Sequence, residues 1–248
     1  MTNADRFHFS DFTRTNYARL IELARRSYAF RRFLDFDRAE RFVLWRHDVD
    51  FSPQGAVKLA AIEREAGVVA TYFVSFHSDF YNLLEREVSD CIGEIAACGH
   101  DVGLHVDLAS SGADTVPLEA TLRQEAEWLS RLTRAECRAF SFHNPDERAA
   151  EFREWQYAGM VNAAAEYFYA DVGFCSDSNG IWRERRLEDV LTAAADHRLQ
   201  VLTHPENWQD AVMSPRERVH RCIDGRAEST RARYHALLDR HRRPSIDW

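Results

Sequence analysis

The sequence of 248 residues has few cysteines and no long apolar run. Its five cysteines, at positions 91, 98, 137, 175 and 222, form no C-x-x-C pair. This odd, scattered set is typical of reduced thiols and argues against a disulfide framework or a cysteine zinc site. No window of about 18 apolar residues occurs, so no membrane-spanning segment is expected. Residues 1–6 lead into no apolar stretch of a secretory signal, and we therefore expect a cytoplasmic protein.

The chain also lacks an excess of positive charge. Its formal net charge is -8 and its sequence pI is near 5.8. This balance argues against a nucleic-acid binder. The arginines between positions 231 and 243 are better explained as a solvated helix face. With 45% hydrophobic and 12% aromatic residues, the chain has enough apolar material for one sizeable core.

Apolar, β-branched and aromatic runs alternate with helical patterns along the chain. We expect strands at 42–50, 68–76, 101–107, 137–144 and 199–204, with a further strand or pair of short strands in 167–174. We expect helices at 53–66, 82–98, 117–134 and 187–195. This alternation predicts repeated βα units and a largely parallel sheet in one α/β domain. A helical lead-in (1–40) would precede the barrel (41–210), and a C-terminal helical segment (211–248) would pack on the same domain.

The stretch from Phe42 to Asp50 combines a buried strand with a concentration of charge. An apolar run is followed by Asp48 and Asp50, and then by Ser52 and Pro53, which are typical of the first residues of a helix. The carboxyl end of a parallel strand is where α/β folds place ligands and chemistry. Two carboxylates on one side of a strand repel each other unless a cation or a shared proton relieves them. The pair is therefore a metal clamp, a base beside a ligand, or two caps.

Three further strand ends carry residues of the same kind. His105 and Asp107 alternate with apolar residues at the end of the third strand, His143 follows the fourth, and His204 follows the last. In a closed parallel barrel these ends meet on one rim. A single histidine is more often structural, but agreement among four strand ends favours a site. A mixed shell of histidine and carboxylate suits Zn²⁺ or another divalent first-row metal in an open catalytic site.

Five motifs in this order resemble those of the polysaccharide deacetylases, the NodB-homology carbohydrate esterases. They are Arg46-His-Asp-Val-Asp50, Gly99-His-Asp-Val-Gly-Leu-His105, Ser141-Phe-His-Asn-Pro145, Ser176-Asp-Ser-Asn-Gly180 and Val201-Leu-Thr-His204. The opening R-H-D-V-D is similar to that of a divergent subgroup. The resemblance covers about 40–210. It implies a distorted (β/α) barrel, commonly with seven strands, and metal-dependent removal of acetyl groups from sugars or related amide hydrolysis.

The resemblance also implies roles for individual residues. Asp48 corresponds to the general base, His204 to the general acid, and Asp50 and His105 to metal ligands. The implied metal is Zn²⁺ first, with Mn²⁺, Co²⁺ or Ni²⁺ as alternatives.

The chain departs from the family pattern in two places. Ala109 stands where the family usually has a second metal-binding histidine. Either Asp107 replaces that ligand, or Asp107 caps the following loop and His143 completes the shell. His143 also occupies the stretch from which an arginine usually orients the base, so it either orients Asp48 or binds the metal.

Three aromatic residues, Trp182, Trp208 and Tyr81, fall on predicted loops at the same rim. They either stack on a sugar ring or pack the loops. The expected function is hydrolysis of an acetyl group from an N- or O-acetylated sugar of a polysaccharide or its precursor. Two alternatives remain: a catalytically silent glycan-binding relative, which Ala109 supports, and a hydrolase of a non-sugar amide. The sequence predicts no particular oligomeric state.

Overall fold

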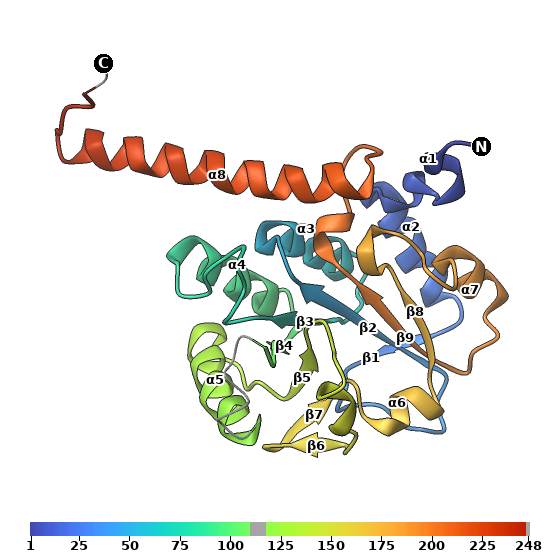
Figure 1. The fold of residues 1–248 in the computed structure, drawn as a ribbon. Coiled ribbons are helices and arrows are strands. Elements are labelled where there is room, and N and C mark those ends of the chain that lie inside the picture. Colours follow the sequence, from blue (N-terminus) through green and yellow to red (C-terminus); the bar gives the residue numbers. More distant parts are fainter. Residues whose placement is uncertain (110–117, 247–248) are drawn as a thin grey trace.

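The computed structural model describes residues 1–109 and 118–246 as a curved sheet with helices packed around it (Figure 1). The strands are β1 (Ala29–Arg31), β2 (Phe42–Val49), β3 (Thr71–Val74), β4 (Asp101–Val106), β5 (Ala139–Phe142), β6 (Gln156–Tyr157), β7 (Met160–Asn162), β8 (Gly173–Ser176) and β9 (Arg198–Thr203). The helices are α1 (Asn3–Arg6), α2 (Arg14–Arg25), α3 (Pro53–Glu65), α4 (Arg86–Ala97), α5 (Leu118–Thr133), α6 (Glu166–Ala170), α7 (Leu187–Ala193) and α8 (Pro215–Arg240). Single 3₁₀ turns are η1 (Phe9–Phe12), η2 (Ala149–Glu151), η3 (Ser178–Gly180) and η4 (Pro205–Asn207).

The sheet contains the seven parallel strands expected of a distorted (β/α) barrel. They follow the order β7-β5-β4-β3-β2-β9-β8, and every neighbouring pair in this run is parallel. The hairpin strand β6 adds an antiparallel edge, and β1 pairs with the first half of β2. Strands β7 and β8 do not pair with each other in the described residues, so the barrel stays open on that side. The prediction of a single α/β barrel domain is confirmed.

Side chains of β2 divide between two apolar clusters because successive residues of a strand point to opposite faces. Val43, Trp45 and Val49 belong to the cluster packed under the outer helices. Phe42 and Leu44 belong to a smaller cluster on the opposite, inner face of the curved sheet. Arg46 and Asp48 continue the sequence of inward residues, so the strand carries its charged side chains to the carboxyl end of the barrel interior.

Two local sequence features shape the surroundings of the site: the cap that begins helix α3 directly after β2, and a glycine within β4. Ser52 caps α3 by accepting a hydrogen bond from the backbone N–H of Gly55, and Pro53 occupies the first turn. On β4, a Cβ built on Gly103 would lie 2.6 Å from the carbonyl oxygen of Ala139 and 2.7 Å from the Phe73 ring. The barrel interior therefore has room only for glycine at position 103, two residues before His105 and on the same face of β4.

The segment 167–174 was expected to be a strand, and this prediction is wrong over its first half. Residues Glu166–Ala170 form helix α6, and the strand begins only at Gly173. The aromatic run suits either structure by composition. Phe168 decides the outcome by packing against Phe33 and Trp155, at ring-centroid distances of 5.3 and 5.4 Å. The lead-in also contains the short strand β1, which the helical pattern of 1–40 did not predict.

Helix α8 begins on the barrel and extends beyond it (Figure 1). The buried guanidinium of Arg218 attaches its first turns by donating to the carbonyl oxygens of Met213 and Gly180. Farther along, Arg226 and Arg233 pair with Glu85 at the start of α4. Pro117, the expected first residue of α5, lies outside the described residues.

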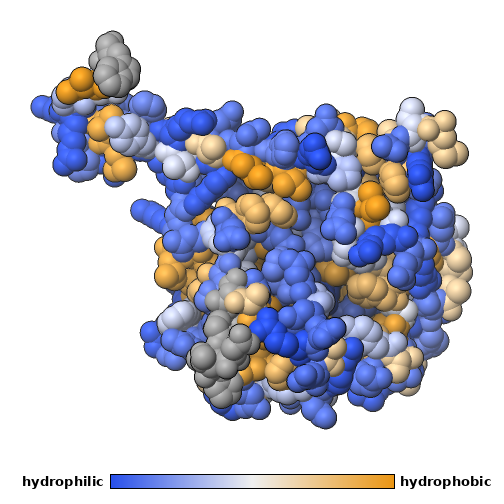
Figure 2. All heavy atoms as spheres, viewed as in Figure 1, coloured by the Kyte–Doolittle hydropathy of each residue, from blue (hydrophilic) through white to orange (hydrophobic). Residues whose placement is uncertain are grey.

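The structure also describes the state of the cysteines and the character of the surface. All five cysteines are free thiols. On the face seen in Figure 2, polar side chains predominate and apolar ones occur in small groups. Among the described residues, no helix is both long enough and apolar enough to cross a membrane.

Candidate metal and catalytic site

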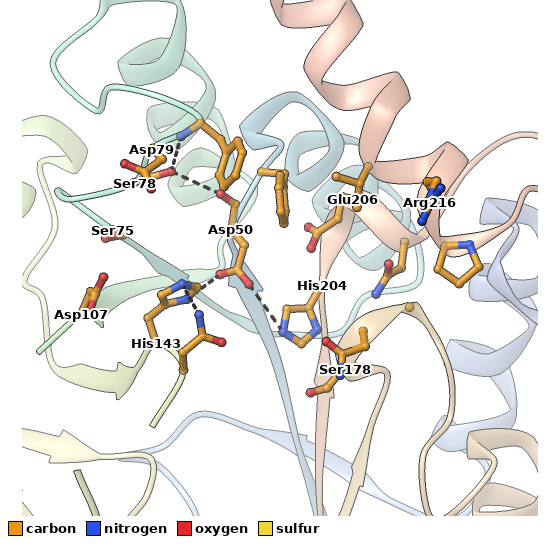
Figure 3. A pocket seen from close by; sticks show the side chains of 18 of the residues that line it. Asp50, Ser75, Ser78, Asp79, Asp107, His143, Ser178, His204, Glu206 and Arg216 are labelled. Atoms are coloured by element: carbon orange, nitrogen blue, oxygen red, sulfur yellow. Dashed lines mark hydrogen bonds and ion pairs between the residues drawn. The ribbon is translucent and has the colours of Figure 1, made fainter. Parts of the chain in front are cut away.

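The carboxyl ends of four strands on one side of the barrel place their polar residues around one centre. Asp48 lies on β2 and Asp50 just after it, His105 lies on β4, and His143 and His204 follow β5 and β9. Figure 3 shows Asp50 between His143 and His204 at the base of a cavity. The cavity measures about 610 Å³ and opens towards the first turns of α8.

Asp50, His105 and His143 form a cluster whose ligand atoms all lie within 4.8 Å of one another. His105 Nε2 is 3.2 Å from Asp50 Oδ1 and 3.2 Å from His143 Nδ1, and the third separation, His143 Nδ1 to Asp50 Oδ1, is 3.4 Å. Asp50 Oδ1 is buried and has no hydrogen bond of proper geometry within the described residues. A buried orphan carboxylate oxygen facing two imidazole nitrogens fits a divalent cation. The residues present therefore suit the metal that the motifs imply.

Hydrogen bonds behind the cluster fix which atoms face its centre. His105 Nδ1 lies 2.7 Å from the hydroxyl of Ser141 on the adjacent strand, which leaves Nε2 directed at Asp50. His143 Nε2 lies 2.9 Å from the side-chain amide of Asn144, which leaves Nδ1 facing the same centre. Partners of this kind orient metal-binding imidazoles. Burial alone would raise the pKa of Asp50, but the facing imidazoles of His105 and His143 outweigh burial and hold that pKa well below its usual range.

Asp107 was expected among the metal ligands, but its side chain lies outside the cluster of Asp50, His105 and His143. Strand β4 ends at Val106, so Asp107 no longer follows the pleat that would keep it beside His105. Its Oδ1 accepts a hydrogen bond of 2.9 Å from the backbone N–H of Ala109. Asp107 lines the cavity but does not belong to the cluster of Asp50, His105 and His143. The geometry thus favours the alternative in which Asp107 caps the loop and His143 supplies the third ligand.

Asp48 is held by a fork of two hydrogen bonds from Arg46, two residues earlier on the same strand. Arg46 Nε donates to Oδ1 at 3.1 Å and Nη2 donates to Oδ2 at 2.6 Å, with both side chains buried. Burial alone would raise the pKa of Asp48, but the charges of Arg46 and His105 outweigh burial and lower it. Asp48 is therefore ionised and lies 3.8 Å from His105 Nε2, beside the proposed metal. The arginine that orients this carboxylate is Arg46, so His143 is not needed for that task.

His204 lies on the opposite side of Asp50 from His143 (Figure 3), and its imidazole is charged. Its Nδ1 is 2.6 Å from Asp177 Oδ1, and its backbone N–H donates to the same carboxylate. Burial alone would lower the pKa of His204, but the hydrogen bond and charge of Asp177 raise it to about 10. The remaining nitrogen, Nε2, points into the cavity 3.9 Å from Asp50 Oδ2. The imidazolium therefore presents a proton to the site at neutral pH.

Of the three aromatic residues expected to stack on a sugar, Trp208 and Tyr81 are buried inside the protein and Trp182 is partly buried. Trp208 is 1% exposed and Tyr81 is 6% exposed, and Tyr81 donates its hydroxyl hydrogen to the carbonyl of Val49. Trp182 stacks on Phe12 and donates to Asp11. The N-terminal segment covers both tryptophans, because Phe12 also contacts Trp208 at a centroid distance of 5.5 Å.

Other aromatic side chains line the cavity and its neighbouring recess. Phe51 and Phe80 contact each other at a centroid distance of 4.1 Å, and Phe80 is 40% exposed at the cavity wall. A second recess of about 600 Å³ contains Tyr169 and Phe174, both exposed. The two recesses share Asp50, His143, Asn144, Ser178, Asn179 and His204. Sequence reasoning missed these aromatics because exposure, which depends on tertiary packing, distinguishes them from buried ones.

Arg46 and Asp177 are site residues to which the sequence assigned no role, although both lie within the quoted motifs. The period-two rule that placed Asp48 and Asp50 on one face applies equally to Arg46, so its contact with Asp48 was predictable. Asp177 follows β8, which neighbours β9, and the parallel pairing brings it to His204. Glu206, in turn η4, also lines the cavity. Its proximity to His204 in the chain was the available signal.

Comparison with known proteins gives structural likenesses of low sequence identity. No protein-family model matches the chain, and no curated protein matches its sequence. A mutant family 4 carbohydrate esterase (CE4) pseudoenzyme of Bacillus anthracis with restored activity is similar at 14% identity and a TM-score of 0.43, over 78% of this chain and 65% of that one. A family 4 carbohydrate esterase of the same organism is similar at 14% identity and 0.40, over 84% and 85%.

A polysaccharide deacetylase of Bacillus cereus is similar at 13% identity and a TM-score of 0.45, over 77% of this chain and 89% of that one. With 65% coverage, the chain spans slightly less than two thirds of the length of the CE4 pseudoenzyme. All three structures come from the group of proteins that the motifs resemble. All three TM-scores are below 0.5.

Proposed function

We propose that this protein is a metal-dependent hydrolase that removes an acetyl group from an N- or O-acetylated sugar of a polysaccharide or its precursor. One observation carries the proposal: an ionised carboxylate and a protonated imidazole both lie beside a cluster suited to a divalent metal. Asp48 lies 3.8 Å from His105, and His204 lies 3.9 Å from Asp50. Base, metal ligands and acid are the three components that hydrolysis of an unactivated amide requires.

Asp50, His105 and His143 would hold the metal, with Zn²⁺ expected first and Co²⁺, Mn²⁺ or Ni²⁺ as alternatives. A divalent metal bound there supplies a Lewis acid for the acetyl carbonyl and lowers the pKa of water towards ~7. The donor set of two imidazole nitrogens and one carboxylate oxygen is typical of catalytic zinc sites. Three protein ligands leave further coordination positions open for water and substrate.

The residues of the chain account for the proton transfers. Asp48 accepts a proton from the attacking water, whose oxygen forms a bond to the acetyl carbon. Arg46 keeps Asp48 ionised and oriented for this step. As the bond between the acetyl carbon and the sugar nitrogen breaks, His204 Nε2 gives its proton to the nitrogen. The products are acetate and an amino sugar, and for an O-acetyl substrate the same proton restores the hydroxyl.

The shape of the site supports a sugar substrate larger than one ring. The two recesses meet over Asp50, His143 and His204, so a chain bound across the centre would occupy both. Each recess contains exposed aromatic side chains, Phe80 in one and Tyr169 and Phe174 in the other, and such rings stack on the apolar faces of sugars. The silent glycan-binding alternative drew its support from Ala109. His143 supplies a third ligand without that position, so this support is lost.

The test is acetate release by the full chain loaded in turn with each metal. Oligomers of N-acetylglucosamine, acetylated xylan and N-acetylated small amines form a suitable substrate panel. We expect acetate from one or more of the acetylated sugars and none from Asp48→Asn under the same conditions. Activity on the small amines alone would favour the non-sugar amide hydrolase. Glycan binding without acetate release under any metal would favour the silent relative.

A further inference from the structure

Glu206 is a buried acidic side chain that the mechanism above does not use. It lies in turn η4, immediately after His204, and is only 4% exposed. Figure 3 shows its carboxyl group directed towards the cavity, on the same side as Asp50 and His204. Nearby side chains already have partners, because Asn207 donates to the carbonyl of Asp177 and Gln209 donates to the carbonyl of Glu206.

The Glu206 carboxyl is unsatisfied in the described part of the chain. Its Oε2 atom is buried and has no hydrogen-bond partner there. A buried polar atom without a partner costs folding free energy, and such atoms are few in native proteins. Exchanging the positions of the two oxygens takes only a rotation about the terminal bond of the side chain, which has a broad torsional preference. The carboxyl group can therefore direct either oxygen at a ligand in the cavity.

The protonation state of this carboxyl suits a neutral polar partner. Burial raises the pKa of Glu206 to about 8, although the charge of His204 opposes the shift. Asp50, on the same cavity wall, adds to the increase. In its protonated form the group is a carboxylic acid, which can both donate and accept a hydrogen bond. A sugar hydroxyl has the same two capacities.

We propose that Glu206 is a substrate-binding residue whose carboxyl group hydrogen-bonds a hydroxyl of the acetylated sugar held beside His204. This inference rests on the proposed function, because it takes the cavity to be the sugar site. Glu206 forms the wall between the proton donor His204 and the first two turns of α8, where Arg216 and His220 line the same cavity. A ring placed with its acetyl group over Asp50 would turn a neighbouring hydroxyl to this wall. A substrate without that hydroxyl would leave the carboxyl unpaired and bind less well.

The test measures binding and stability of the full chain separately from hydrolysis. The probe is the trimer of N-acetylglucosamine, titrated calorimetrically into the parent protein, Glu206→Gln and Glu206→Met. Glutamine keeps a donor and an acceptor, so we expect its Kd within about threefold of the parent value. Methionine has a similar length and no strong hydrogen-bonding group, and we expect its Kd to rise at least about tenfold. Removing an unsatisfied buried carboxyl should leave the melting temperature of Glu206→Met equal to or above that of the parent.

The outcomes separate this inference from the proposed function. Trimer binding by the parent without acetate release would count against the hydrolase, while a weaker Glu206→Met complex would still support the binding role. Equal Kd values for the parent and Glu206→Met would overturn it, as would no trimer binding by the parent. A fall in melting temperature together with unchanged binding would show that Glu206 has a structural role only.

Discussion

Arg46 and Asp48 form a buried, two-pronged ion pair between neighbours on one face of a single strand. The Nε–Oδ1 and Nη2–Oδ2 distances are 3.1 and 2.6 Å. The base of the proposed mechanism is thus oriented by its own strand. Strand geometry, and not a separate loop, sets the direction in which Asp48 faces the site.

Replacing Arg46 by methionine should shift the pH profile of hydrolysis. Burial then acts on Asp48 without the opposing guanidinium, so the Asp48 pKa rises and the base stays protonated to higher pH. The acid limb of kcat/KM against pH should move upward, and activity at pH 7 should fall by about 10- to 100-fold. Arg46→Lys keeps the charge but loses the two-pronged hydrogen bonding, so its acid limb should lie between those of the parent and Arg46→Met. An unchanged acid limb in Arg46→Met would show that Arg46 does not set the Asp48 pKa.

Metal-binding measurements in solution can distinguish the proposed ligand His143 from Asp107, which caps the following loop. His143→Ala removes a proposed ligand, and we expect its affinity for Zn²⁺ to fall at least about tenfold. Asp107→Asn is the matched control, because asparagine still caps the backbone N–H of Ala109 and its metal content should equal that of the parent. Metal analysis after equilibrium dialysis checks both variants. Loss of metal from Asp107→Asn but not from His143→Ala would reverse the assignment.

Asp177 should control the alkaline limit of the reaction. It raises the pKa of His204 to about 10, so removing its charge lowers that pKa, and the imidazole loses its proton at lower pH. In Asp177→Asn the alkaline limb of kcat against pH should therefore move downward towards the ordinary histidine value of ~6.5. Asparagine keeps an oxygen that can accept from Trp208. An alkaline limb that stays in place would remove His204 as the general acid.

A second polar network, outside the sheet and away from the cavity, should govern stability. Glu63 is fully buried on α3 and accepts hydrogen bonds from Tyr17 and Tyr72, with His47 Nε2 2.6 Å away. Glutamine at position 63 would turn an amide N–H₂ towards these donors. We expect Glu63→Gln to lower the free energy of unfolding by about 3–5 kcal/mol, the usual cost of breaking a buried pair. Denaturant titration at pH 7 measures it, with Glu119→Gln in an exposed pair as the control, expected within about 0.5 kcal/mol.

The same substitution predicts a pH dependence of stability. Burial would raise the pKa of Glu63, but the charge and hydrogen bond of His47 outweigh burial and lower it. A depressed carboxyl pKa stabilises the fold above the unfolded value of ~4.3, and this contribution disappears as the pH falls through the folded value. The difference between parent and Glu63→Gln should therefore shrink below about pH 4. A difference that stays constant down to pH 3 would contradict this reading.

The period-two pattern of strands made much of the site predictable from the sequence. It placed Asp48 with Asp50 and put His105 on the inner face of β4, because neither assignment needs more than the direction of a side chain on a strand. For Asp107 the period-two rule no longer applies. It shares the face of His105 only if the strand continues, and β4 stops one residue earlier, at Val106.

The aromatic residues could not be placed in the same way. Whether Trp182 and Trp208 face substrate or protein depends on Phe12, which lies about 170 to 200 positions earlier in the chain and covers both. The helix at Glu166–Ala170 has a similar origin, since contacts of Phe168 with the distant Phe33 select helix over strand. Local patterns carry no information about such long-range contacts.

The most direct test of the metal centre is anomalous diffraction from a crystal of the full chain soaked in Zn²⁺. The account predicts one peak that lies ~2.0–2.2 Å from a carboxylate oxygen of Asp50, from His105 Nε2 and from His143 Nδ1. Asp48 and His204 should then lie beside the peak without being displaced. A peak bound by Asp107, or one more than about 4 Å from His143, would contradict the assignment of the metal ligands.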